Sequence, residues 1–77
     1  MARRGNEAWA FELARKREPT GRWIITVADF LRELQGVGFD WSPSQANEYI
    51  KFYQPSWRLQ VEGDYGLNTY YKYNMNQ

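Results

Sequence analysis

The pattern of apolar and polar positions changes its period along the chain. Residues 27–35 place apolar side chains at the i, i+3, i+4 and i+7 positions of a surface helix, which are Val27, Phe30, Leu31 and Leu34. Beyond Pro55 the period becomes two, with Trp57, Leu59 and Val61 alternating with polar residues. Such alternation predicts strands with one buried face. We therefore expect helices first and a sheet at the C-terminal end.

Two further segments have a helical pattern. In residues 6–17, Asn6 can cap the helix, and an apolar stripe follows at Trp9, Ala10, Leu13 and Ala14. Phe11 lies off this stripe and is expected to cover a neighbouring element. Pro19 and Gly21 interrupt the pattern, so the sequence predicts a first helix that ends by residue 17.

The second of these segments, residues 43–53, has the clearest start and end of any predicted helix. Ser42, Pro43 and Gln45 form an S-x-x-Q capping box with proline at the first helical position. Pro55 ends the helix. The apolar back consists of Ala46, Tyr49, Ile50 and Tyr53, and the polar front of Ser44, Gln45, Asn47, Glu48 and Lys51.

Three short segments are predicted as strands. Residues 22–25 form a short, β-branched segment bounded by turn residues, whereas 57–62 and 67–73 alternate on either side of "GDYG" and predict a hairpin. A lone hairpin is marginally stable in water, so the strand at 22–25 is a candidate third member. The fold class is α+β: a single domain over 1–77 with three helices, a C-terminal β-hairpin and a short extra strand.

The composition excludes several kinds of chemistry. The chain has 77 residues with no cysteine and no histidine, so disulfides, thiolate nucleophiles, imidazole bases and the usual zinc sites are excluded. Its four Trp, four Phe and six Tyr predict an aromatic core. The nearest carboxylate pairs, Asp29 with Glu33 and Glu62 with Asp64, are typical of solvated surface. We expect no enzyme activity, no cofactor and no metal.

The charge is unevenly distributed. Residues 1–22 hold six basic and three acidic residues, whereas residues 23–77 hold four basic and six acidic ones. This asymmetry indicates either an anionic partner for the basic end or a solvated helix face. Residues 1–5 are predicted to be a flexible basic arm, in which Arg3 and Arg4 either reach DNA or are merely disordered. The other basic residues of this end can hold a DNA backbone from the side: Arg15, Lys16, Arg17 and Arg22.

The order of these elements resembles the winged helix-turn-helix superfamily over nearly the whole chain. The resemblance implies that the helix at 43–53 enters the major groove of double-stranded DNA and that the loop from Gly63 to Gly66 is the tip of the wing. The residues that it implies would face DNA are Ser42, Ser44, Gln45, Asn47 and Lys51. By their charge, Arg58 and Lys72 on the hairpin and Arg3 and Arg4 at the basic end are further candidates for DNA binding. Glu62 and Asp64 at the tip, and the long loop at 36–42, depart from the superfamily pattern.

The resemblance implies a small DNA-binding protein that acts as an accessory regulator of transcription or replication. Aromatic residues beyond the helical stripes support an alternative, in which a larger protein is the partner of an adaptor or inhibitor. Phe52, Tyr65 and Tyr70 are the candidates for that interface, whereas Trp23, Phe39 and Trp41 are expected to complete the core. The segment "LNTYYKYN" is compatible with stacking of single-stranded bases, although an ordinary sheet surface explains it more simply.

Neither alternative involves a membrane. No stretch of the sequence has the length of an apolar membrane span, and the basic start is followed by no sustained apolar region. We expect a soluble protein of the cytoplasm.

Overall fold

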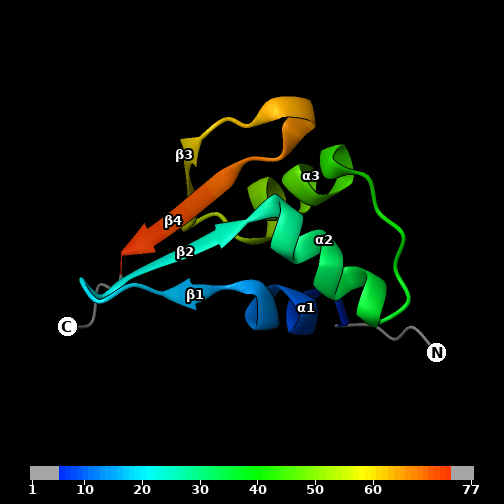
Figure 1. Cartoon of the computed structure of the whole chain (residues 1–77), viewed down its shortest axis with the longest axis horizontal. Helices are drawn as coiled ribbons and strands as arrows, with labels where there is room; N and C mark the ends of the chain where they lie inside the picture. The colour runs from blue at the N-terminus through cyan, green and yellow to red at the C-terminus, as the bar shows by residue number, and fades with distance from the viewer. Residues whose placement is uncertain (1–5, 74–77) are drawn as a thin grey trace.

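The computed structural model describes residues 6–73, which form an α+β domain of three helices and a four-stranded antiparallel sheet (Figure 1). The elements in chain order are α1 (Asn6–Ala14), β1 (Lys16–Arg17), β2 (Arg22–Thr26), α2 (Val27–Gly36), α3 (Pro43–Tyr53), β3 (Arg58–Val61), the 3-10 turn η1 (Asp64–Gly66) and β4 (Thr69–Tyr73). The predicted fold class is confirmed.

The starts of α2 and α3 follow the capping signals of the sequence. The Thr26 hydroxyl accepts a hydrogen bond from the Asp29 amide at 3.1 Å. At α3 both halves of the capping box form: the Gln45 amide donates to Ser42 Oγ at 3.3 Å, and the Ser42 amide donates to Gln45 Oε1 at 2.9 Å. Each cap satisfies amides that the first helical turn leaves without a partner.

The first helix is shorter than the sequence predicts, because the residues that follow Ala14 pair with β2. Lys16 lies opposite Ile24 and Arg17 opposite Trp23. The intervening turn is closed by a hydrogen bond from the Glu18 amide to the Arg22 carbonyl at 2.8 Å. Tertiary pairing therefore overrides the local signal of three basic residues, which is typical of a helix C-terminus.

The strands occur in the order β1-β2-β4-β3, so β2 and β4 lie at the centre (Figure 1). Arg22 pairs with Tyr73, and the register continues to Thr26 opposite Thr69. The hairpin of β3 and β4 carries an irregularity between Leu59 and Val61. The expectation that the strand near residue 22 joins the hairpin is confirmed, and the hairpin strands are shorter than predicted.

Phe11 lies in the core, whereas only half of the stripe predicted for the first helix does: Ala10 and Ala14 are buried, and Trp9 and Leu13 are exposed. The Phe11 ring packs edge-to-face against Phe30 at 5.3 Å and Trp57 at 5.2 Å between centroids. Phe11 is 2% exposed, whereas Trp9 is 56% exposed. The face of α1 that is buried consists of Ala10, Phe11 and Ala14. This face also has helical spacing, and its two alanines allow close approach of α2.

Candidate nucleic-acid interface

The polar front of α3 is largely occupied by bonds within the protein. The side chains of Ser42 and Gln45 form the capping box described above. Asn47 Nδ2 donates to the Gly66 carbonyl at 2.8 Å, while its Oδ1 accepts from the Tyr70 hydroxyl at 2.8 Å and from Asn68 Nδ2 at 3.2 Å. The predicted reading residue Asn47 thus joins α3 to the hairpin.

The hairpin loop is fitted closely to this amide. Gly66 has φ +81°, and a Cβ at that position would lie 3.3 Å from both Asn47 Nδ2 and Pro43 Cβ. At Gly63 a Cβ would collide with the Leu67 carbonyl. Both glycines are therefore required by the backbone at the tip of the predicted wing.

Tyr65 occupies the tip itself and is the non-glycine residue with a left-handed backbone within residues 6–73, at φ 60°. Its side chain is 91% exposed. Glu62 and Asp64 precede it in the sequence, so the tip carries negative charge. A groove of about 680 Å³ separates the hairpin from α3, with Ser44, Lys51 and Tyr65 among the residues that line it.

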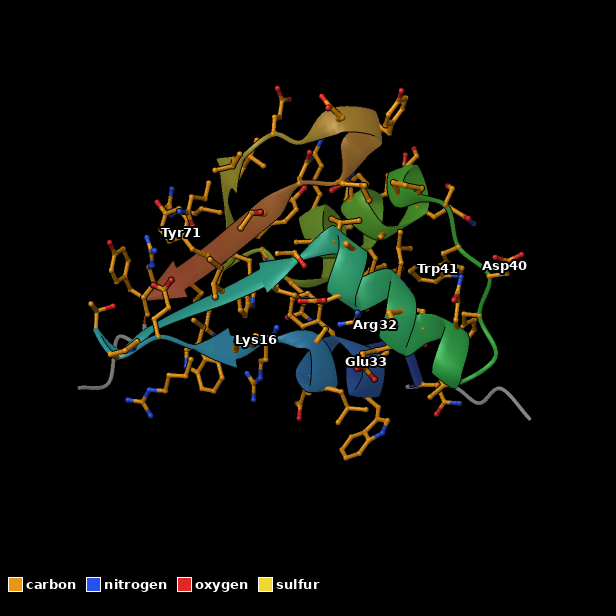
Figure 2. The ribbon with its side chains drawn as sticks, viewed as in Figure 1. Lys16, Arg32, Glu33, Asp40, Trp41 and Tyr71 are labelled. Carbon is orange, nitrogen blue, oxygen red and sulfur yellow. The ribbon has the colours of Figure 1, made fainter. Side chains whose placement is uncertain are left out.

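Basic side chains gather instead at the end of the sheet where β2 begins and β4 ends. We call this end of the sheet, with both of its faces, the basic sheet end; its residues are Arg15, Lys16, Arg17, Arg22, Arg58 and Lys72. Arg17, Trp23 and Lys72 are cross-strand neighbours in one row, and Lys16, Ile24, Tyr71 and Arg58 form the adjacent row, which points to the opposite face. Figure 2 shows Lys16 and Tyr71 on the sheet, far from Asp40 and Trp41 in the loop before α3.

Aromatic rings lie close to three cations of the basic sheet end. The guanidinium carbons of Arg15 and Arg17 lie 4.5 Å and 5.9 Å from the centroid of the Trp23 ring. Lys72 Nζ lies 5.7 Å from the centroid of Trp57. A ring attracts a nearby cation without neutralising it. These three charges therefore remain available to an anion.

Two of the six cations have carboxylate partners. Lys16 Nζ lies 3.3 Å from Asp29 Oδ2, and Arg22 Nε donates to Glu18 Oε1 at 2.8 Å. Within residues 6–73 no ion pair involves the other four, which are Arg15, Arg17, Arg58 and Lys72.

The charge state of Asp29 is controlled by the basic residues near it. Burial raises the pKa of this carboxyl group, but hydrogen bonds with Lys16 and Thr26 and the charges of Lys16 and Arg32 outweigh burial, so the pKa lies below its ordinary value. The hydrogen bond that Arg22 donates to the Glu18 carboxylate raises the pKa of Arg22 above its ordinary value. Asp29 and Arg22 are therefore both charged at neutral pH.

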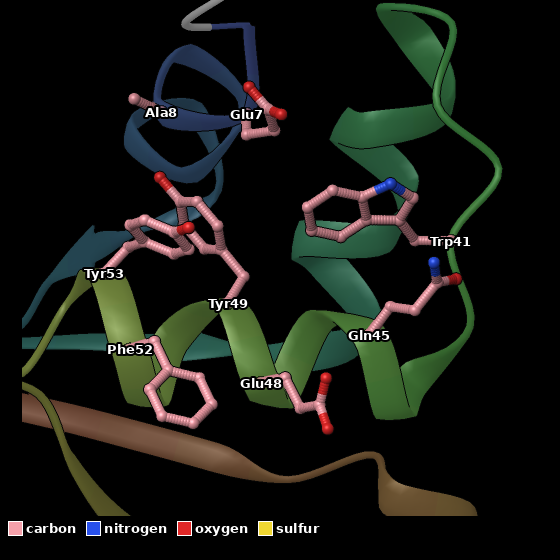
Figure 3. A pocket seen from close by; sticks show the side chains of 8 residues that line it. All are labelled: Glu7, Ala8, Trp41, Gln45, Glu48, Tyr49, Phe52 and Tyr53. Carbon is pink, nitrogen blue, oxygen red and sulfur yellow. The ribbon is translucent and has the colours of Figure 1, made fainter.

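A second groove, of about 610 Å³, lies between α1 and α3 (Figure 3). Trp41, Tyr49 and Tyr53 form its aromatic wall, and the Tyr49 and Tyr53 rings stack at 5.2 Å. Glu7 and Glu48 add two carboxylates to its lining. This side of the molecule is therefore acidic and aromatic, in contrast to the basic sheet end.

The predicted site residues therefore fall into separate groups. Arg58 and Lys72 lie at the basic sheet end, whereas Ser44 and Lys51 are exposed on α3. The sequence analysis named Arg15 and Arg17 as residues that can hold a DNA backbone from the side, but the row that Arg17 forms with Trp23 and Lys72 depends on the strand register. Arg3 and Arg4 lie outside the described residues.

The three aromatic candidates of the alternative are also separated. Phe52 is exposed and lines the groove between α1 and α3, and Tyr65 lines the groove beside the hairpin. Tyr70 is half-buried, because its ring packs against the core and its hydroxyl group bonds Asn47. Only Phe52 and Tyr65 therefore present most of their ring surface to solvent.

Within the described part of the chain, no helix is long and apolar enough to cross a membrane. No cluster of three or more acidic side chains among residues 6–73 is arranged to hold a metal ion.

The sequence matches no protein-family model, and no curated protein or solved structure matches it. The resemblance to the winged helix-turn-helix superfamily therefore stays a prediction.

Proposed function

We propose that this chain is a small DNA-binding protein of winged-helix type, an accessory regulator of transcription or replication, and that the basic sheet end supplies its phosphate contacts. The observation that carries the proposal is the collection of six cations at one end of the sheet, four of them without a carboxylate partner among the described residues. Neutralisation of phosphates by Lys and Arg provides most of the affinity of DNA-binding proteins.

The front of α3 has a smaller part in this proposal. Ser44 and Lys51 are exposed and free to approach DNA, but the amide groups that suit adenine recognition are engaged in the cap and in the hairpin contact. The negative charges of Glu48, Glu62 and Asp64 also oppose a phosphate backbone on this side. We therefore expect the sheet to provide most of the affinity for DNA and α3 to recognise few bases.

The test uses two lysines that are well matched. Lys72 Nζ lies 5.7 Å from the Trp57 ring, and Lys51 Nζ lies 5.6 Å from the Phe52 ring, so each alanine variant removes one charge and one ring contact. Binding to a fluorescent DNA duplex would be measured by anisotropy over a series of salt concentrations. Lys72→Ala should weaken binding several-fold and reduce the slope of log K against log salt by about one, whereas Lys51→Ala should change neither.

Two results would contradict the proposal. A larger effect of Lys51→Ala than of Lys72→Ala would place the DNA on α3. Absence of salt-dependent binding by the unaltered protein would exclude duplex DNA as the partner. Circular dichroism of both variants controls for loss of folding.

A second candidate function is supported by the groove between α1 and α3. Tyr53 and Phe52 are 71% and 67% exposed beside it, and large exposed aromatics are typical of protein-interaction surfaces. An adaptor that docks a larger protein there would lose its partner on Phe52→Ala while it retained DNA binding. Retention of a purified partner by that variant would exclude this groove.

A further inference from the structure

The sheet has two chemically different faces. Ile25 is buried in the core, and Trp23 and Tyr70 pack against it, so these residues mark the face that the helices cover. Side chains alternate between faces along a strand. Ile24 and its cross-strand partner Tyr71 therefore lie on the opposite, open face.

The register identifies the other residues of this open face. Arg22 lies opposite Tyr73 on the central strands, and Arg58 lies opposite Tyr71 at the β3 edge. Lys16 lies opposite Ile24 at the other edge. Within residues 6–73, neither Tyr71 nor Tyr73 belongs to the apolar core cluster or to the apolar side chains packed against it. The open face thus combines two tyrosines with three cations, of which Lys16 and Arg22 are paired with Asp29 and Glu18, while Arg58 has no carboxylate partner among the described residues.

The aromatic and basic groups of the open face lie close together. The Tyr71 and Tyr73 rings have centroids 5.6 Å apart in a T-shaped arrangement, and the Arg22 guanidinium carbon lies 5.6 Å from the Tyr71 centroid. The Tyr73 side chain is more exposed than that of Tyr71. A tyrosine pair flanked by arginines provides ring surfaces for bases beside charges for phosphates.

We propose that this open face binds single-stranded DNA, with bases stacked on Tyr71 and Tyr73 and the strand's phosphates contacted by Arg22 and Arg58. This inference rests on the proposed function, and it adds that the DNA is single-stranded. Cations serve single and double strands alike, whereas a duplex already stacks its bases internally and gains little from exposed rings. The tyrosines therefore favour a single strand.

The test compares a fluorescent oligothymidine with the same strand annealed to oligoadenine, at equal salt. We expect the single strand to bind about tenfold more tightly, since stacking of one base on an aromatic ring typically has that effect. Tyr71→Val should remove this preference without weakening duplex binding. Valine keeps a β-branched side chain in the strand.

Matched variants separate stacking from other effects. Tyr71→Phe should keep the preference because it keeps the ring, and Tyr53→Ala, at an exposed tyrosine on α3, should leave both affinities unchanged. If Tyr71→Val unfolds, Tyr73→Val at the more exposed position should reduce the preference in its place. Either ring-removing variant that folds and keeps the full preference would overturn the inference.

The outcomes distinguish the inference from the proposed function. Equal affinity for the two DNA forms, with no effect of Tyr71→Val, would overturn single-strand recognition while DNA binding stands. No binding to either form would overturn both.

Discussion

The polar front of α3 and the basic sheet end differ in what their side chains are free to do. On α3, Asn47 makes three hydrogen bonds to the hairpin, and Gln45 closes the cap. At the sheet end, Arg15 and Arg17 lie over Trp23 and have no carboxylate partner among the described residues. Polar side chains on the surface of a helix are therefore poor evidence for a binding site unless they have no hydrogen-bond partners within the protein.

The largest expected effect concerns Asn47. Asn47→Ala removes the contacts that hold the hairpin against α3 and leaves the Gly66 carbonyl and the Tyr70 hydroxyl without their partner. The free energy of unfolding should fall by about 2 kcal/mol, measured by urea denaturation. Ser44→Ala, on the same face but without a side-chain hydrogen bond to another described residue, is the control and should change stability by less than about 0.5 kcal/mol. Equal stability of the two variants would mean that Asn47 is not a structural contact.

A smaller effect is expected at Asp29, the carboxylate that pairs with Lys16. Its pKa is lowered in the folded protein, so its stabilisation is complete above the ordinary carboxyl pKa and is lost as the pH falls through the folded-state value, below about pH 4. Asp29→Asn should cost less than about 1 kcal/mol at neutral pH and should flatten this part of the acid unfolding profile, followed by thermal unfolding.

The affinity of the Asp29→Asn variant for DNA also tests which of the two surfaces binds DNA. Loss of the carboxylate leaves Lys16 free for phosphate, so Asp29→Asn should bind DNA more tightly than the unaltered protein. Glu48→Gln removes one negative charge from α3 and should leave the affinity nearly unchanged. The reverse order of affinities would assign DNA to the α3 side.

The smallest expected effect is at the tip of the hairpin. Tyr65 has a left-handed backbone, which glycine adopts without strain. Tyr65→Gly should raise the free energy of unfolding by less than about 0.5 kcal/mol, because relief of strain is largely offset by the greater freedom of glycine in the unfolded chain. DNA affinity should not change. A fall in affinity measured by anisotropy would show that the tip takes part in binding.

The parts of the fold that local signals determine were predictable from the sequence. The Thr26 and Ser42 caps and the helical stripe of α2 depend on neighbouring residues, and they form as expected. The face of α1 was not predictable, because the stripes through Trp9 and through Phe11 both have helical spacing, and packing against Phe30 and Trp57 selects the second. Local periodicity cannot distinguish two such stripes.

The candidate site was predictable only in part, for a similar reason. Lys72 and Arg58 could be named from the alternation of the hairpin, but the row formed with Arg17 and Trp23 depends on the pairing of β1 with β2 and of β2 with β4. The bond between Asn47 and Gly66 spans nineteen residues. No short-range signal indicates such a contact, so the sequence placed Asn47 among the DNA-binding residues.

DNA binding at the basic sheet end is tested most directly by an amide NMR titration of the isotopically labelled protein with oligothymidine, at low and then moderate salt. Shift changes should concentrate in residues 15–17, 22–24, 58 and 71–73 and should diminish as salt increases. Residues 42–51 and the hairpin tip should remain nearly unchanged. If the shift changes were concentrated in residues 42–51 and absent from the sheet, DNA binding at the basic sheet end would be contradicted. The front of α3 would then be the binding surface.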